Sequence, residues 1–176
     1  MRKIFLLLAL LLFYTSLNAK ALILPREIMK YNYPNSEKIV KKNILLNSKE
    51  AKNIQKLAKV KLKRKIFKVF KAIKNNNIQG YGILIKRKVR SKNVVVLYII
   101  NTNHTLKSME IVAFNEPIEY KPSQKWSDTF KDKRTNKNLR AGKEITTITG
   151  ATLSARAITD GSRLAFAFYN EILKDR

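Results

Sequence analysis

Four apolar runs follow one another through the middle of the chain, separated by polar residues typical of turns. Each run is rich in β-branched and aromatic residues, the composition that strands favour. The runs lie at about 65–73, 79–85, 94–100 and 106–114. The third, VVVLYII, is the most apolar stretch after residue 22 and suits a strand buried on both faces. The pattern predicts an antiparallel β-meander over residues 65–114.

The apolar spacing becomes helical near the C-terminus. From Leu153 to Lys174, apolar residues recur every three or four positions, which predicts a long helix with Gly161 as a weak point. A short helix can begin at Ser123 and carry Trp126 and Phe130 on one face.

Helical patterns also precede the sheet. Asn47 or Ser48 can cap an amphipathic helix that has Glu50 in its first turn and reaches about residue 62. Its lysines form either a solvated outer face or a surface that rests on anionic lipid or an acidic redox partner. A weaker helical pattern begins at Ser36. The fold class expected is therefore α+β: an antiparallel β-meander sheet with flanking helices and a C-terminal helix.

The first residues have the pattern of an export signal. Arg2 and Lys3 precede a mostly apolar stretch at 4–17, and small or polar residues follow it. The alternative is an uncleaved anchor, although the apolar stretch is shorter than the ~20 residues of a comfortable span. Either way we expect the body of the protein outside the cytoplasm, in the periplasm or on the outer face of the cytoplasmic membrane. We divide the chain into residues 1–21 (signal or anchor), 22–64 (a helical, basic segment) and 65–176.

The charge balance restricts the partners. The chain has 37 basic and 12 acidic residues, for a net charge of +25. Such a charge favours anionic partners, namely nucleic acid, anionic lipid or an acidic protein. Export argues against nucleic acid, so none is expected.

Two residue types are nearly missing from the sequence. The chain has no cysteine, which excludes disulfides, thiol catalysis and cysteine-ligated metals. Its single histidine, His104, is predicted at an exposed hairpin tip and makes histidine metal sites and serine–histidine triads improbable. We therefore expect no metal site and no catalytic residue set.

The candidate site lies where the C-terminal helix begins. Thr149-Gly150-Ala151-Thr152 leads into the helix, and Ser154 follows just beyond. A helix N-terminus presents unpaired backbone N–H groups and the positive end of the helix dipole, which together suit a phosphate. Gly150 and Ala151 allow a close approach. A hydroxyl here can cap the helix, bind a phosphate or be esterified to one.

Thr149-Gly150-Ala151-Thr152 resembles the flavinylation motif of FMN-binding domains, in which an Asp, two variable residues and Ser or Thr precede Gly-Ala-Thr. The motif occurs in the covalently flavinylated subunits of the sodium-translocating NADH:quinone oxidoreductase and of Rnf complexes, and in small exported flavoproteins. The resemblance covers roughly residues 65–173 and makes 65–176 the FMN-binding domain. One position departs from the pattern, because Thr146 stands where the family has Asp, and the nearest acid is Glu144.

The resemblance implies a cofactor and its attachment. In the family, the last Thr of the motif carries FMN through a phosphoester bond, which a Mg-dependent FMN transferase installs from FAD. Carried over, Thr152 is the acceptor. Glu116, Tyr120 and Trp126 are candidates for contact with the flavin, although Trp126 can equally serve to dock its helix on the sheet.

The expected function is an exported electron carrier that holds FMN. Its partners would be the FAD:protein FMN transferase and redox donor and acceptor proteins, such as acidic cytochromes or a membrane quinone-linked complex. An anionic membrane surface is a further partner. Two alternatives stay open: a basic exported module that binds anionic membranes or polymers without redox chemistry, and the flavin-bearing component of a reductase complex.

Overall fold

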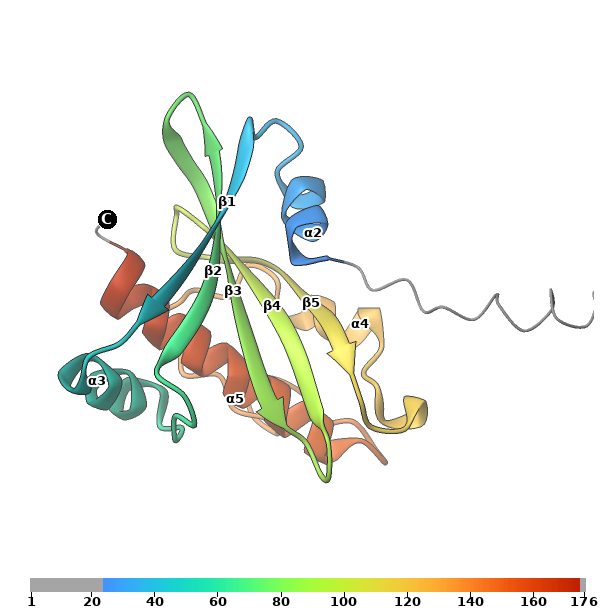
Figure 1. Ribbon diagram of the computed structural model, residues 1–176. Coiled ribbons are helices and arrows are strands. Elements are labelled where there is room, and N and C mark those ends of the chain that lie inside the picture. The colour runs from blue at the N-terminus through green and yellow to red at the C-terminus, as the bar shows by residue number, and fades with distance from the viewer. Residues whose placement is uncertain (1–23, 175–176) are drawn as a thin grey trace, which may run out of the picture.

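The structure is a computed structural model that describes residues 24–174, in which one sheet is flanked by helices (Figure 1). The predicted signal or anchor at residues 1–21 lies outside the described residues. None of the helices in the described part of the chain combines the length and the hydrophobicity of a membrane-spanning helix.

Five antiparallel strands form the sheet, in the order β1-β2-β3-β4-β5. Their bounds are Lys38–Leu45 (β1), Ile66–Lys74 (β2), Asn77–Lys88 (β3), Asn93–Asn101 (β4) and Leu106–Phe114 (β5). β2 to β5 are the four predicted strands in the predicted order, and β4 is buried along most of its length. The expected α+β fold with an antiparallel meander is therefore confirmed.

The first strand, β1, corrects the prediction of a helix beginning at Ser36. Lys38 to Leu45 pair residue by residue with Ile73 to Ile66 of β2, so the backbone hydrogen bonds of this segment go to a neighbouring strand. Ile39 packs into a small hydrophobic cluster under α2. Pairing with an existing sheet outweighs a weak local helical pattern, because tertiary contacts override propensities of a few tenths of a kcal/mol per residue.

Within residues 24–174, four α-helices surround the sheet: α2 (Pro25–Asn32), α3 (Ser48–Ala58), α4 (Gln124–Ser127) and α5 (Thr152–Phe168). The 3-10 turns η1 (Ile118–Tyr120) and η2 (Asp128–Phe130) flank α4, and the π-helical segment η3 (Tyr169–Leu173) continues α5. Asn47 caps α3 in a reciprocal capping box with Glu50, and the Ser123 hydroxyl caps α4, both as predicted. The helix α2 was not predicted, although Pro25 at its first turn is a known start signal.

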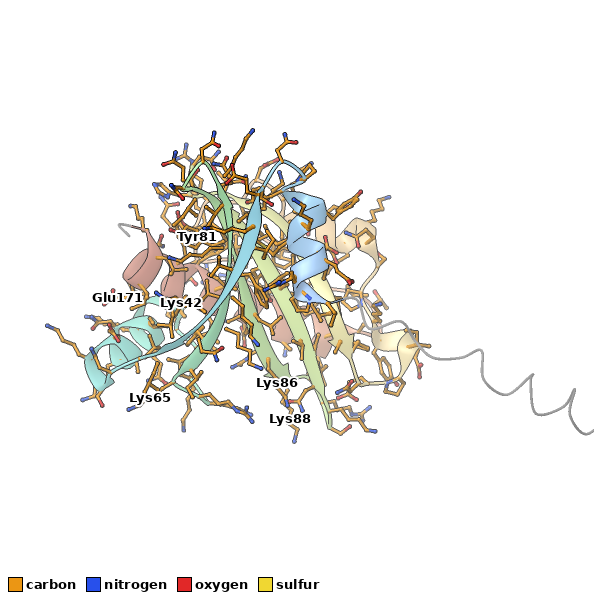
Figure 2. The ribbon with its side chains drawn as sticks, turned by 45° about the horizontal axis from the view of Figure 1, so that its top comes forward. Lys42, Lys65, Tyr81, Lys86, Lys88 and Glu171 are labelled. Carbon is orange, nitrogen blue, oxygen red and sulfur yellow. The ribbon has the colours of Figure 1, made fainter. Side chains whose placement is uncertain are left out.

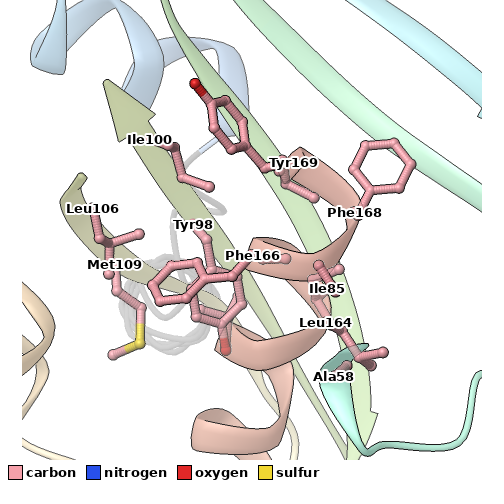
Figure 3. Packing of buried hydrophobic residues seen from close by; sticks show 14 of the residues in the cluster. Ala58, Ile85, Tyr98, Ile100, Leu106, Met109, Leu164, Phe166, Phe168 and Tyr169 are labelled. Carbon is pink, nitrogen blue, oxygen red and sulfur yellow. The ribbon is translucent and has the colours of Figure 1, made fainter. Parts of the chain in front are cut away.

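The helix α5 lies along one face of the sheet and forms most of the core with it (Figure 1). Tyr98 of β4 and Phe166 of α5 lie in the layer between them (Figure 3). The Tyr98 hydroxyl donates a 2.6 Å hydrogen bond to the carbonyl oxygen of Ile158. A side chain at Gly161 would clash with that hydroxyl, so this glycine permits the close approach of helix and strand.

The other face of the sheet carries the short helix α2. Met29 and Tyr33 pack over Gly82 and Gly80, where a Cβ atom would collide with them. The two glycines therefore allow the close approach of this helix to the sheet.

His104 is not the exposed histidine that the sequence predicts. Its side chain is half-buried, and its Nδ1 lies 2.8 Å from the hydroxyl oxygen of Tyr169. The backbone of His104 has a φ of +66° and lies in the tight connection between β4 and β5. The prediction failed because it treated the hairpin tip in isolation, whereas the C-terminal helix reaches that end of the sheet.

Candidate functional site

The site is built on the first turn of α5. Gly150 has a φ of +77°, a left-handed conformation that glycine adopts at little cost. Ala151 follows as the N-cap residue, and its N–H donates to the carbonyl oxygen of Ile148 at 3.0 Å. The tight turn before the helix therefore explains why a glycine and a small residue precede Thr152.

No side chain caps the start of this helix. The first N–H bonded to a carbonyl within the helix is that of Ala155, which donates to Ala151. The N–H groups of Thr152, Leu153 and Ser154 precede that bond and have no partner one turn back in the helix. The first turn also has no acidic residue, so the positive end of the helix dipole is not offset there.

Ser154 supplies an unusual polar atom. Its side chain is 1% exposed, and its Oγ has no hydrogen-bond partner among the described residues. A buried hydroxyl without a partner costs about 1–3 kcal/mol, so such atoms are rare unless a ligand satisfies them. Ser154 also lines the hollow at the start of α5, where a bound group could reach it.

Thr152 occupies the first helical position and is half-buried. Its Oγ1 donates to the carbonyl oxygen of Ile148 at 3.3 Å, near the upper limit for a hydrogen bond. The hydroxyl therefore does not cap the helix, because Ala151 is the N-cap residue and Thr152 bonds backward. This geometry argues against a plain capping role for Thr152.

A pocket of about 180 Å³ lies at this helix start. The motif residues Gly150, Ala151 and Thr152 form one side with Leu153 and Ser154. The opposite side is made by the β3–β4 turn and the segment after β5, through Val89, Arg90, Glu116 and Tyr120. The predicted residues Glu116 and Tyr120 thus share one pocket with the motif.

Glu116 holds this wall of the pocket in place. Its Oε1 accepts hydrogen bonds from the backbone N–H groups of Arg90, Ser91 and Lys92 at 2.7–2.9 Å. The Ser91 hydroxyl donates to its Oε2 at 3.3 Å. These bonds, above all that from Lys92, lower the pKa of the Glu116 carboxyl, so the residue is ionised at neutral pH. The carboxylate clamps the β3–β4 turn against the segment that carries Tyr120.

Two predicted residues lie outside this pocket lining. Thr149 is exposed and precedes the turn at Gly150. Trp126 is buried in the main core, with its ring edge-on to Phe130 at 5.1 Å between centroids. Its indole N–H donates to the carbonyl oxygen of Thr146 at 2.9 Å. Trp126 thus docks its helix, the alternative stated from the sequence, and also holds the loop that leads to the motif.

The position where the family has Asp is exposed and neutral. Thr146 presents its side chain to solvent. The nearby acid, Glu144, accepts a hydrogen bond from the Arg140 N–H at 2.9 Å and forms an ion pair with the Arg140 guanidinium at 3.7 Å. Its own backbone N–H and Arg140 lower the pKa of the Glu144 carboxyl. This carboxylate is therefore occupied within its own loop.

Val89 and Arg90 also line the pocket, although the sequence did not predict them there. They lie in a turn some 60 residues before the motif and reach the pocket only because β3 ends beside the start of α5. No local pattern marks them. Arg90 is exposed and places a cation at the rim of the pocket, which suits an anionic ligand.

Comparisons with known proteins identify the domain. Residues 90–167 match the family model of the FMN-binding domain, and this segment contains every residue that lines the pocket except Val89. Among solved structures, the chain is similar to the crystal structure of Shewanella oneidensis NqrC, with a TM-score of 0.55 and 13% sequence identity. That similarity covers 82% of this chain and 87% of the other and shows a shared fold. No curated protein matches the sequence. Residues 90–167 are therefore similar to the FMN-binding domain family, and the cofactor that this match indicates is FMN.

Proposed function

We propose that this chain is an exported electron-transfer flavoprotein that carries FMN on Thr152 through a phosphoester bond. The observation that carries the proposal is the buried, unpartnered Ser154 hydroxyl. It lies in the first turn of this uncapped helix, and the half-buried Thr152 lines the same pocket. The set suits a phosphate ester, because it offers an acceptor hydroxyl, free N–H donors and a further hydroxyl donor within one turn.

Different residues of the pocket would bind the phosphate and the planar ring of FMN. The N–H groups of Thr152, Leu153 and Ser154 would hydrogen-bond the phosphate, and the Ser154 hydroxyl would gain the partner it lacks. Arg90 adds positive charge at the rim. Tyr120, half-buried in the opposite wall, offers a ring face for a planar group.

Attachment would follow the chemistry of a phosphoanhydride. The Thr152 Oγ1 forms a bond to the FMN phosphorus of FAD, and the bond from that phosphorus to the bridging oxygen of the pyrophosphate breaks. AMP leaves with that oxygen, and the hydroxyl proton is released to the transferase or to solvent. The hydrogen bond from Oγ1 to the carbonyl oxygen of Ile148 has to break, and because it is 3.3 Å long it is weak and little free energy is lost.

Electron transfer is proposed from the cofactor and the surface together. Bound FMN supplies one- and two-electron chemistry, while the chain positions it and sets its surroundings. A net charge of +25 would steer the protein to acidic donors and acceptors, such as cytochromes or a membrane quinone-linked complex. Arg2 and Lys3, followed by the apolar stretch at 4–17, support export to the periplasm or the outer face of the cytoplasmic membrane.

The proposal is tested by the colour of the purified protein. We expect protein co-expressed with an FMN transferase to be yellow, and to remain yellow after denaturation and desalting. Bleaching and return of the flavin absorbance on chemical reduction and reoxidation would support the redox role. A colourless wild-type protein that also fails to bind free FMN would refute the flavin proposal.

A further inference from the structure

A second hollow, of about 510 Å³, lies where two neighbouring strands separate. The pairing of β2 with β3 ends at Lys68 and Leu84. Beyond that point Ile66 and Phe67 of β2 pair only with β1, while β3 continues to Lys88 paired only with β4. The sheet therefore divides into a fork, and one backbone edge of β3 has no partner strand in the described part of the chain.

The lining of this fork is strongly basic. Six cationic side chains and no acidic one line it: Lys63, Arg64, Lys68, Lys86, Arg87 and Lys88. Among the described residues, only Arg87 of the six forms an ion pair, with Asp160 at 3.6 Å. Figure 2 shows Lys86 and Lys88 at the same end of the sheet as Lys65, which adds another cation near the fork. Like charges gathered this closely repel one another, and an anionic partner would relieve that repulsion.

The fork also presents apolar surface. Leu62, Phe67 and Leu164 contribute to its lining. Ile66, which is 59% exposed, also lines the fork, and its cross-strand partner Leu45 is 70% exposed. The combination of apolar floor, cationic rim and an open strand edge suits an extended peptide, whose backbone can pair with the edge while alternate side chains point to the floor and the rim.

The fork lies next to the proposed flavin site. Lys88 lines the fork, and the next two residues of the chain, Val89 and Arg90, line the pocket at the start of α5. A partner held in the fork would thus be close to that pocket.

We propose that the fork between β2 and β3 is the docking site for an acidic, extended segment of the redox partner. This inference rests on the proposed function for the identity of the partner as a redox protein. The site itself requires no flavin, so its binding can be measured on flavin-free protein.

The test uses a fluorescent hexapeptide of alternating Glu and Val and the flavin-free full chain. We expect saturable binding that weakens at least about tenfold in Arg64→Glu/Lys86→Glu/Lys88→Glu. A matched variant, Lys49→Glu/Lys52→Glu/Lys56→Glu, changes the net charge equally on the exposed face of α3 and should weaken binding less than about threefold. Circular dichroism and thermal unfolding establish that both variants are folded.

Several results would overturn the inference. Equal weakening by the two variants would mean that the overall charge, and not the fork, attracts the peptide. If inorganic tripolyphosphate bound as tightly as the peptide, and if the fork variant weakened its binding equally, the fork would be a site for small anions. If anionic lipid vesicles bound to wild type and less to the fork variant, while the peptide did not bind at all, the fork would be a membrane contact. Flavin attachment without peptide binding would refute this inference alone, and peptide binding without flavin attachment would refute the proposed function alone.

Discussion

Replacing Ser154 with alanine is expected to change stability in opposite directions in the flavin-free and flavin-bearing protein. The Ser154 hydroxyl is buried without a partner, so the flavin-free chain bears the cost of removing it from water. In the flavinylated protein the same hydroxyl is proposed to bind the phosphate. Its removal then deletes a hydrogen bond to a charged group.

The expected sizes follow from those two environments. An unsatisfied buried hydroxyl costs about 1–3 kcal/mol, so Ser154→Ala should raise the free energy of unfolding of the flavin-free protein by about 1 kcal/mol. That change corresponds to a rise of about 2–4 °C in Tm for a chain of this length. A hydrogen bond to a charged group contributes about 1.5–3 kcal/mol, so the flavinylated variant should be less stable than flavinylated wild type by about 1–2 kcal/mol.

The assay is denaturant unfolding of wild type and Ser154→Ala, each produced with and without the FMN transferase. Ser162→Ala serves as the matched control, because Ser162 lies in the same helix, is fully buried and donates to the carbonyl oxygen of Thr159 at 2.7 Å. Its replacement should change stability by the same amount in both forms. The reasoning is wrong if Ser154→Ala destabilises the flavin-free protein, or if the flavin leaves its effect unchanged.

Three further predictions concern the frame of the site. Gly161→Ala should destabilise the protein by about 1–3 kcal/mol in thermal unfolding, because the new methyl group collides with Tyr98. The alanine also raises the helix propensity by about 1 kcal/mol, which offsets this loss only in part. An unchanged Tm would contradict the close packing of Gly161 against Tyr98. Glu116→Gln should lower stability at neutral pH, where the lowered pKa of the wild-type carboxyl contributes to folding. That contribution is lost as the pH falls from 4.5, the ordinary pKa of a glutamate carboxyl, through the lowered pKa of Glu116. The free energies of unfolding of wild type and variant should therefore converge in acid. A difference between them that does not change with pH would argue against the clamp. Thr146→Asp restores the family's acid at an exposed position. On co-expression with the FMN transferase it should raise the fraction of chains modified at Thr152, measured by in-gel flavin fluorescence. The free energy of unfolding should change by less than about 0.5 kcal/mol.

The sheet was predictable because its strands carry local signals. The runs that form β2 to β5 are β-branched or aromatic and are bounded by turn residues, so pattern alone gave their order and approximate ends. The strand β1 carries a weak helical spacing, and only its pairing with β2 makes it a strand. That pairing is a contact between segments almost 30 residues apart, which no local pattern encodes.

The candidate site was predictable in part for the same reason. Gly150, Ala151 and Thr152 are contiguous and begin a periodic helix, so the sequence places them together. Arg90 joins them only through the folded position of the β3–β4 turn, which the Glu116 carboxylate fixes. The unpartnered state of Ser154 is a property of packing and could not be predicted from residue type.

The most direct test of FMN attachment at Thr152 is the intact mass of the full chain co-expressed with the FMN transferase. Thr152→Ala removes the proposed acceptor, and Thr147→Ala removes an exposed hydroxyl at a variable position of the motif as the matched control. The same spectra report whether the predicted signal at residues 1–21 has been removed. We predict a mass gain of one FMN less one water in wild type and Thr147→Ala, and none in Thr152→Ala. An unmodified wild-type chain, or a modified Thr152→Ala chain, would contradict the assignment of Thr152 as the flavin acceptor.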